Sequence, residues 1–288
     1  MDPRRLLTFR AVAHERSFSA AARALSLTQP AVSQQVAALE KEVGARLLDR
    51  EPGGLKLTGA GTVLLEHADA LADRLQLART QLAELAGDER LRVGAFPSAL
   101  AALVPKAVAR VAAPEVLVEE GSTPELAERV RRGELHLAVG FQDAAQPRRE
   151  HESTIRHDLA CEPFLVALWP GHRLAELDAV PIKALADEPW VAPSSEGVIA
   201  RACQNAGFEP RLVMLSRDAL ANRALVAEGL AVTLMPKLLA HDFAGIELRP
   251  VKGNGPKRDL YALTAPGGRH PLVQPTLDAL AEVASELT

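Results

Sequence analysis

The sequence predicts a multidomain α/β protein with a short helical head, one long connecting helix and a larger body. Three observations predict this fold class. Short helical segments separated by Ser- and Thr-rich breaks fill residues 1–50, and one uninterrupted helical pattern covers 59–86. From Leu91 onward, short apolar strands alternate with helical segments. At a typical ~150 residues per domain, 288 residues correspond to about two domains.

The composition is typical of a folded protein without disulfides. Hydrophobic residues make up 48% and charged residues 24% of the chain. Cys161 and Cys203 are too few for a disulfide-stapled secreted scaffold. The N-terminal segment lacks the apolar core and cleavage site of a signal peptide, and no uncharged apolar run reaches the ~18 residues of a membrane span. We therefore expect a cytoplasmic protein that makes no membrane contact.

The charge is unevenly divided along the chain. Residues 1–58 hold 9 Lys and Arg against 6 Asp and Glu, which gives a net charge of +3. The net charge is −2 over 59–87 and −5 over 88–288. A basic head on an acidic body is typical of a head that meets a polyanion.

Two adjoining helices in the head give the most specific pattern. Ser19 is predicted to cap a short helix over Ala20–Leu25, and a break at 26–28 follows. Thr28 then caps a second helix, whose first turn tolerates Pro30 because the missing N–H would be unpaired there in any case. Apolar residues at helical spacing predict the buried face of this second helix: Val32, Val36, Leu39 and Val43.

The opposite face of the second helix is uncharged and rich in amides and hydroxyls. It carries Gln29, Ala31, Ser33, Gln34 and Ala37. In the DNA major groove, Gln can form two hydrogen bonds with adenine, Ser can bond a base or a phosphate, and Ala can meet the thymine methyl. The N–H groups at the helix N-terminus can bind phosphate. The face favours DNA reading over the alternative, a solvated face of a helical bundle, where Lys and Glu would be expected.

A small β-hairpin is predicted after these helices. Pro52-Gly53-Gly54 lies between Leu48 and the apolar segment Leu55–Leu57, an arrangement typical of a tight turn between two strands. Arg50 and Lys56 flank the turn and can touch the sugar–phosphate backbone. The alternative is that they are ordinary exposed cations beside a turn.

The helix over 59–86 carries an apolar seam of period 3.5. Its spacing of 4, 3, 4, 3, 4, 3 is the pattern that winds helices into left-handed pairs. Thr58 and Gly59 mark the start of the helix and Gly87 marks its end. We expect the seam to pair two subunits, and the alternative is packing against its own domain. The seam residues are Leu64, Ala68, Leu71, Leu75, Ala78, Leu82 and Leu85.

Alternating strands and helices make up the body. Such alternation favours right-handed βαβ units and mainly parallel sheets, in one large sheet or in two lobes. The predicted strands are Leu91–Ala95, Glu115–Glu119, Leu135–Val139, Phe164–Trp169, Trp190–Ala192, Arg211–Leu215, Leu230–Leu234, Ile246–Val251 and Arg258–Thr264. The predicted helices are Ser98–Val111, Thr123–Arg132, 197–205, 218–228 and 272–286.

Much of the head follows one continuous run, FxAVAxxxSFSAAARALxLTQPAVSQQVAALEKEVGxRLLDR, followed by LTxAG. Over about residues 5–65 this run resembles the winged helix-turn-helix of the LysR-type transcriptional regulators. Body segments such as EGSTPELAERVRRGELHLAVG and VAEGLAVTLMP are compatible with the effector-binding domain of that family. The resemblance implies a linker helix that pairs subunits and a two-lobed body like a periplasmic binding protein.

The resemblance also implies a division of the chain and a set of partners. The DNA-binding head would cover 1–58, the linker 59–87 and the effector-binding domain 88–288. Within that domain, lobe 1 would cover about 90–161 and 267–288, and lobe 2 about 162–266. The family implies a homotetramer that binds double-stranded promoter or operator DNA and can contact RNA polymerase. By the same resemblance, Gln29, Pro30, Ser33 and Gln34 would meet the bases, with Thr28, Arg50 and Lys56 nearer to the phosphates.

Three turns that follow predicted strands carry hydroxyls where open α/β folds bind ligands. They contain Ser98, Thr123 and Ser195. Their alternative role is helix capping, since Ser122 and Glu125 already form the S-x-x-E pattern of a capping box. By family resemblance, the turns of Ser98 and Ser195 line the cleft between the lobes. We expect a small anionic effector there, such as a carboxylate metabolite.

Other functions have less support in the sequence. No H-x-x-x-H or C-x-x-C pair, G-x-S-x-G elbow or phosphate-binding G-x-x-x-x-G-K occurs, so we expect no enzyme, no metal site and no cofactor. A redox-sensing regulator that uses Cys161 and Cys203 is the alternative, since some LysR-type regulators detect peroxide through a cysteine pair. A solute-binding protein without regulatory function is less favoured, because it would normally carry an export signal.

Overall fold

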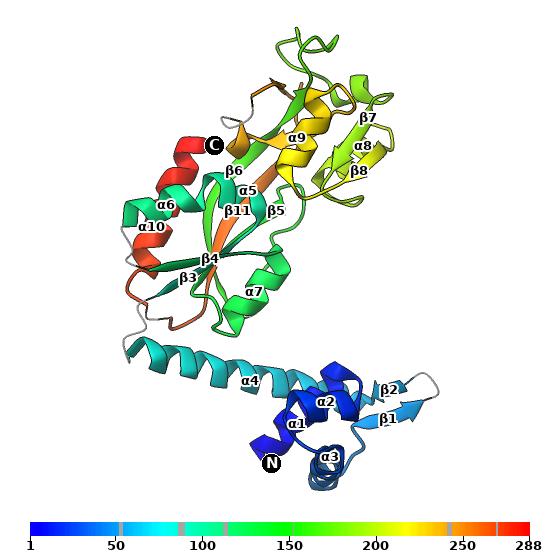
Figure 1. Ribbon diagram of the computed structural model, residues 1–288, viewed down its shortest axis with the longest axis vertical. Coiled ribbons are helices and arrows are strands. Elements are labelled where there is room, and N and C mark those ends of the chain that lie inside the picture. The colour runs from blue at the N-terminus through cyan, green and yellow to red at the C-terminus, as the bar shows by residue number, and fades with distance from the viewer. Residues whose placement is uncertain (52–53, 86–89, 112–114, 152, 241–243, 269) are drawn as a thin grey trace. The chain divides into compact units, whose positions relative to one another are not determined.

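Figure 1 shows a computed structural model of the protein. The structure describes residues 1–288 except 52–53, 86–89, 112–114, 152, 241–243 and 269, and it leaves out the side chains of 50–51 and 83–85. The chain forms two compact units, Met1–Thr80 and Gln81–Thr288. No helix in the described part of the chain is long and apolar enough to cross a membrane.

The first unit holds the helical head and most of the long helix. β1 and β2 pair antiparallel with Leu48 opposite Leu57, which confirms the predicted hairpin, although its tip at 52–53 lies outside the described residues. The end of the long helix near Gly87 also lies outside them. The elements are α1 (Pro3–Glu15), α2 (Phe18–Ala24), α3 (Gln29–Val43), β1 (Leu48–Glu51), β2 (Gly54–Leu57) and α4 (Gly59–Leu85), which continues into the second unit.

Side-chain caps determine where the head helices begin. The predicted cap at Ser19 is wrong: the Ser17 hydroxyl accepts a hydrogen bond from the backbone N–H of Ala20 at 3.2 Å. Either serine can cap a helix, but an earlier start lets Phe18 pack against the head core. The Thr28 hydroxyl accepts from the backbone N–H of Ala31 at 3.4 Å and begins α3 as predicted.

The apolar face of α3 holds the head together. Val32, Val36 and Leu39 are at most 3% exposed and belong to the same core as Phe9 of α1, which confirms the predicted periodicity. Val43 is 36% exposed, so its predicted burial is wrong. It is the last residue of α3, beyond the last turn that contacts the core.

The second unit is an α/β body in which every predicted strand overlaps an observed one. The predicted helix over Ser98–Val111 is divided in two at Leu103. The strands are β3 (Leu91–Ala95), β4 (Val116–Glu120), β5 (Leu137–Asp143), β6 (Ile155–Leu168), β7 (Pro189–Ala192), β8 (Arg211–Leu215), β9 (Thr233–Pro236), β10 (Glu247–Pro250) and β11 (Lys257–Thr264). The helices are α5 (Pro97–Ala102), α6 (Val104–Val111), α7 (Thr123–Arg131), α8 (Val198–Asn205), α9 (Ala219–Ala227) and α10 (Val273–Leu287), with short 3₁₀ turns η1 (Ile182–Leu185) and η2 (Lys237–Leu239).

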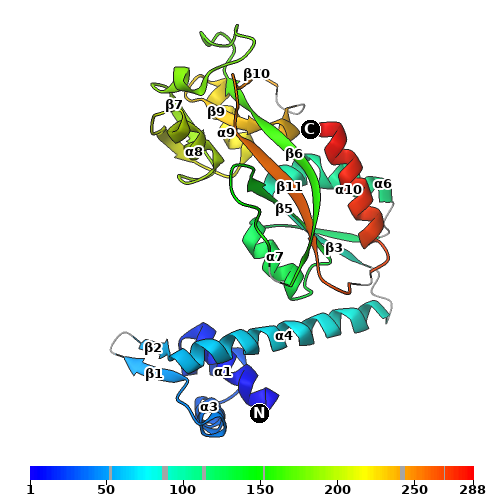
Figure 2. The ribbon, with the colours of Figure 1, turned by 180° about the vertical axis from the view of Figure 1, so that it is seen from behind.

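The main sheet is mixed, so the prediction of mainly parallel sheets is wrong. β3 pairs parallel with β4 and β5, and β7 pairs parallel with β8. β11 pairs antiparallel with both β5 and β6, and β6 pairs antiparallel with β9 and β10. The prediction assumed a helical crossover after each strand, but the residues described between β5 and β6, 144–151 and 153–154, form no helix. Figures 1 and 2 show β6 and β11 running side by side along the body.

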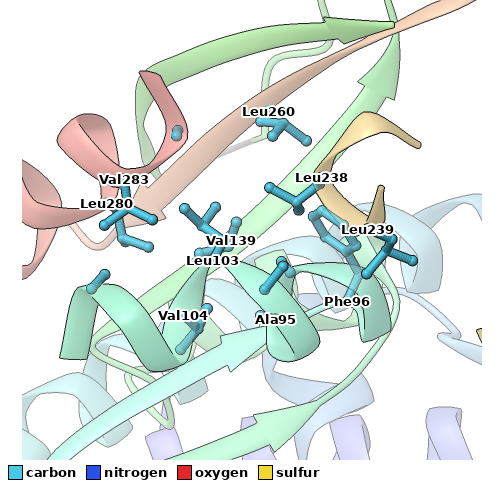
Figure 3. Packing of buried hydrophobic residues seen from close by; sticks show 14 of the residues in the cluster. Ala95, Phe96, Leu103, Val104, Val139, Leu238, Leu239, Leu260, Leu280 and Val283 are labelled. Atoms are coloured by element: carbon cyan, nitrogen blue, oxygen red, sulfur yellow. The ribbon is translucent and has the colours of Figure 1, made fainter. Parts of the chain in front are cut away.

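Two hydrophobic clusters fill the two lobes of the body. The first gathers around β3, β5 and β11 and is covered by α5, α6 and α10. Figure 3 shows Leu103, Val139 and Leu280 meeting at its centre. The second surrounds Trp190, which is fully buried, with Val166 and Leu168 of β6. β6 contributes to both clusters and so connects the two lobes.

Replacing Leu39 by Ala is expected to lower the free energy of unfolding of the head by about 2–5 kcal/mol, because a fully buried leucine leaves a cavity. Urea denaturation followed by the helical circular dichroism signal measures the change. Leu27 is 41% exposed, so Leu27→Ala is the matched control and should change stability by less than about 0.5 kcal/mol. Equal losses for the two variants would contradict this packing.

Candidate functional site

The solvent side of α3 presents the residues predicted to meet DNA bases. We call Gln29, Pro30, Ser33 and Gln34 the recognition face. Ser33 is half-buried and the other three are exposed. Within the described part of the chain, no hydrogen bond engages the side chains of Gln29, Ser33 or Gln34. Their donors and acceptors are therefore available to a ligand.

The neighbouring Gln35 behaves differently and shows how α3 is oriented. Its Oε1 accepts a hydrogen bond of 2.6 Å from the hydroxyl of Thr8 on α1. Each residue of a helix is rotated by about 100° from the one before it. Gln35 therefore connects α3 to α1, whereas the preceding residue, Gln34, faces solvent.

Of the three residues predicted to lie near phosphates, Thr28 and Lys56 have side chains that the structure describes. Thr28 is exposed, and its hydroxyl already accepts the capping hydrogen bond of α3. Lys56 is exposed on β2, opposite Asp49 of β1. The side chain of Arg50 lies outside the described residues. The structure thus places Thr28 and Lys56 at the protein surface.

α4 is fastened to α1 by a charged cluster. Asp69 accepts hydrogen bonds from Arg10 Nε at 2.6 Å and pairs with His14 Nε2 at 2.8 Å. Burial opposes ionisation of this carboxyl, but the hydrogen bonds from His14 and Arg10 outweigh it and lower the pKa of Asp69. The head and the first half of α4 are therefore joined by polar as well as apolar contacts.

The predicted seam of α4 divides into two parts. Leu64, Ala68 and Leu71 pack with the core of their own head, and Ala68 is fully buried. Leu75 and Leu82 are 44% and 65% exposed, and Ala78 is exposed as well. The side chain of Leu85 lies outside the described residues. Packing against its own domain, the alternative for this helix, applies to the first part only.

In the body, Ser98 lies beside a buried ion pair. Its Oγ accepts a hydrogen bond of 2.9 Å from Nη2 of Arg258 on β11. Arg258 is 4% exposed and bonds Glu162 of β6, which is fully buried. Burial lowers the pKa of Arg258, and the charge of Glu162 opposes that shift.

The other two predicted effector contacts differ in exposure. Thr123 is 8% exposed, and its hydroxyl accepts a hydrogen bond of 3.2 Å from the backbone N–H of Phe141. This bond ties α7 to β5. Ser195 is exposed in the turn before α8, and no described residue bonds its side chain.

Charged residues link the turn at 193–197 to β5 and Ser98 to the paired strand β11. Arg201 of α8 forms an ion pair with Asp143, with Nε and Oδ2 2.8 Å apart, and its Nη1 donates to a carbonyl of the turn at 3.2 Å. Asp143 lies opposite Arg258 in the register of β5 with β11. Arg258 in turn bonds Ser98. The charged contacts of two of the three predicted hydroxyl turns thus reach opposite positions on the paired strands β5 and β11.

Sequence reasoning missed these charged residues. Arg258 begins a predicted strand, Glu162 lies two residues before another, and Asp143 lies four residues after a third. Their positions beside apolar strands were a signal, since charged side chains are almost never fully buried unless paired. Neither the pairing of Arg258 with Glu162 nor that of Arg201 with Asp143 could be read from local spacing.

The two thiols do not favour redox chemistry. Burial raises the pKa of Cys203 to about 12, and Cys203 is fully buried in α8. Burial and a hydrogen bond with Asp259 raise the pKa of Cys161, which is exposed on β6. Redox-sensing cysteines instead have lowered pKa values that favour the thiolate. Among the described residues, no group of three or more His, Cys, Asp or Glu is arranged to hold a metal ion.

Two family models match most of the chain. The model of the bacterial regulatory helix-turn-helix protein, lysR family, matches residues 3–62, and the model of the LysR substrate binding domain matches 86–285. The Hca operon transcriptional activator HcaR of Escherichia coli (strain K12) is 29% identical, with both chains fully covered. The SDS degradation transcriptional activation protein of Pseudomonas sp. (strain ATCC 19151) is 32% identical over 93% of this chain and 91% of its own.

Solved structures share the fold along the whole chain. ArgP from Mycobacterium tuberculosis has a TM-score of 0.66 at 23% identity, covering 100% of this chain and 98% of its own. Full-length CbnR complexed with its target DNA has a TM-score of 0.60 at 23% identity, covering 98% of this chain and 100% of its own. The matched families and relatives are transcriptional regulators rather than enzymes.

Both thiols are expected to stay reduced under mild peroxide, because burial raises the pKa of each thiol and so disfavours the reactive thiolate. Thiol titration of the unfolded protein before and after treatment measures this, with DNA binding followed in parallel. Cys161→Ser serves as the control that reports on Cys203 alone. Loss of both thiols together with altered DNA binding would instead support the alternative function, a redox-sensing regulator.

Proposed function

The chain belongs to the LysR family of bacterial transcriptional regulators, and we propose that it reads its operator through the recognition face of α3. The observation that carries this proposal is that Gln29 and Gln34 are exposed with unengaged amides, whereas Gln35 is used inside the head. Amides suit the adenine edge in the major groove. The half-buried Ser33 hydroxyl and exposed Pro30 complete the face.

Phosphate contacts in this proposal come from the rim of the head. Thr28, Arg50 and Lys56 would lie against the sugar–phosphate backbone on either side of the recognition face. The net charge of +3 on residues 1–58 supports an attraction to double-stranded promoter DNA that is independent of sequence. Phosphate contacts orient the head, and base contacts select the operator.

The proposed assembly is a homodimer through α4 that pairs further into a homotetramer. Leu75, Ala78 and Leu82 support it, because they continue the seam and are left exposed by their own head. Leu85 extends the same seam in sequence. Leu64, Ala68 and Leu71 would contribute by fixing the helix to the head. At a promoter, this assembly would lie beside RNA polymerase.

The proposed ligand of the body is a small anionic metabolite held between its two lobes by Ser98 and Ser195. The match to a substrate binding domain supports a ligand in this part of the chain. The register pairing of Asp143, which bonds Arg201 beside the turn at 193–197, with Arg258, which bonds Ser98, supports one shared site. Thr123 would stabilise the site indirectly, since its hydroxyl accepts a hydrogen bond from β5 and so holds α7 in place.

In the proposed mechanism, the effector shifts a population of conformations. The head would cover 1–58, the linker 59–87 and the effector-binding domain 88–288, with lobes near 90–161 and 267–288 and near 162–266. A ligand that binds one lobe arrangement better favours it. A changed arrangement of paired heads would then change the bending of the bound DNA and so its affinity.

Replacing Gln34 by Ala is expected to reduce discrimination between operator and random DNA by about 1–3 kcal/mol, because it removes hydrogen bonds to a base edge. Lys56→Ala should instead weaken binding to both DNAs alike and flatten the salt dependence. Fluorescence anisotropy at several salt concentrations measures both effects. Gln274→Ala, an exposed glutamine of α10, is the matched control. Equal losses on both DNAs for Gln34→Ala would exclude it from base reading.

Replacing Ser98 by Ala is expected to leave operator affinity unchanged and to reduce the response to an organic anion, because it removes a hydrogen bond to the ligand. Thermal unfolding of the full chain with a panel of organic anions identifies the responding ligand, since binding to the folded state raises Tm. Ser285→Ala on the exposed side of α10 is the control. An undiminished shift in Ser98→Ala would remove Ser98 from the site.

A further inference from the structure

The buried ion pair of Arg258 and Glu162 has a bonding partner at each carboxylate oxygen. Both Nε and Nη2 of Arg258 lie 2.5 Å from Glu162 Oε1. The other carboxylate oxygen, Oε2, accepts a hydrogen bond of 2.8 Å from the backbone N–H of Leu238. Such pairs are often no more stabilising than an apolar pair of the same volume. Stability alone therefore does not account for this one.

Aromatic rings enclose the guanidinium and keep it in a fixed position. The central carbon of Arg258 lies 4.9 Å from the ring centres of both Phe96 and Phe141 and 5.6 Å from that of Phe164. Rings at this range attract a cation and exclude water from its surroundings. The direction in which Arg258 donates is consequently set by rigid neighbours in β5, in β6 and at the start of α5.

Nη2 of Arg258 also donates a hydrogen bond of 2.9 Å to Ser98 Oγ. A guanidinium carries donors and no acceptor, so the Ser98 oxygen can only accept in this bond. The hydroxyl proton of Ser98 must then point to a different atom. No acceptor for it lies among the residues that the structure describes, and Ser98 is only half-buried.

We infer that Arg258 is a positioning residue that fixes Ser98 as a hydrogen-bond donor and thereby selects a carboxylate effector. The inference rests on the proposed effector site at Ser98. A hydroxyl that accepts from a cation becomes a stronger donor, and a carboxylate is a stronger acceptor than a neutral amide oxygen. Because Glu162 balances the charge of Arg258, the selection depends on donor direction and not on net charge.

The experiment compares matched carboxylates and amides as probes of the full-length protein. Acetate, succinate and benzoate are titrated calorimetrically beside acetamide, succinamide and benzamide. The variant Arg258→Met/Glu162→Gln removes the pair without leaving a lone buried charge. We expect the preference for carboxylate over amide to fall by about tenfold or more in this variant, with amide binding unchanged. A merely structural role would weaken both classes of probe alike.

Two further variants make the result independent of folding. Arg258→Lys keeps a cation that can bond Ser98 and should retain most of the carboxylate preference. This variant can be measured independently of whether the double variant folds. In a Ser98→Ala background, removal of the pair should cause no further loss of preference, since the two groups act through one hydroxyl. Additive losses would overturn the inference.

The outcomes separate this inference from the proposed effector site. If Ser98→Ala loses carboxylate binding while the double variant keeps the full preference, the site stands and the role of Arg258 is wrong. If Ser98→Ala binds carboxylates normally, both are wrong. Failure of every carboxylate to bind the unmodified protein would also overturn the selection of carboxylates, without affecting DNA recognition.

Discussion

The packing of the apolar face of α3 against the head is the constraint on which the remaining structure of the DNA-binding unit depends. Val32, Val36 and Leu39 can be buried together in only one rotation of the helix about its axis. That rotation turns Gln34 to solvent and brings Gln35 to Thr8. The polar face is therefore directed by apolar residues on the opposite side. A substitution in the core of the head that rotates α3 would consequently also change which polar side chains of α3 face DNA.

Local periodicity predicted the elements well, because whether a segment forms a helix or a strand depends mainly on the spacing of apolar residues within that segment. The α3 face and the strand Leu91–Ala95 could be located from spacing alone. Strand direction could not, because it depends on which distant segments pair. β11 joins β5 to β6 in the sheet, although 88 residues lie between β6 and β11 in the chain and 113 lie between β5 and β11. Helix ends were also uncertain where two caps compete, as Ser17 and Ser19 do.

The two candidate sites differ in how far the sequence could reveal them. The recognition face is a single helix, so its residues are neighbours in the chain and share one pattern. The site in the body is assembled across the fold: Ser98 and Arg258 are 160 residues apart, and Glu162 and Arg258 are 96 apart. The hydroxyl turns could be recognised as candidates. The ion pair of the charged residues next to these turns could not be predicted, because it forms only when β6 pairs with β11.

The attachment of α4 to the head has a consequence for operator geometry. Asp69 and the packing of Leu64 and Leu71 make the head and the start of α4 one rigid piece. Inserting a single residue between Asp69 and Leu75 would therefore turn the exposed leucines by about 100° around the helix axis relative to the head. In a paired assembly, both heads would swing around the DNA axis, and half-sites would have to shift in helical phase to be read together. Under the proposed pairing through α4, the length of this helix would therefore set the operator spacing that both heads can read.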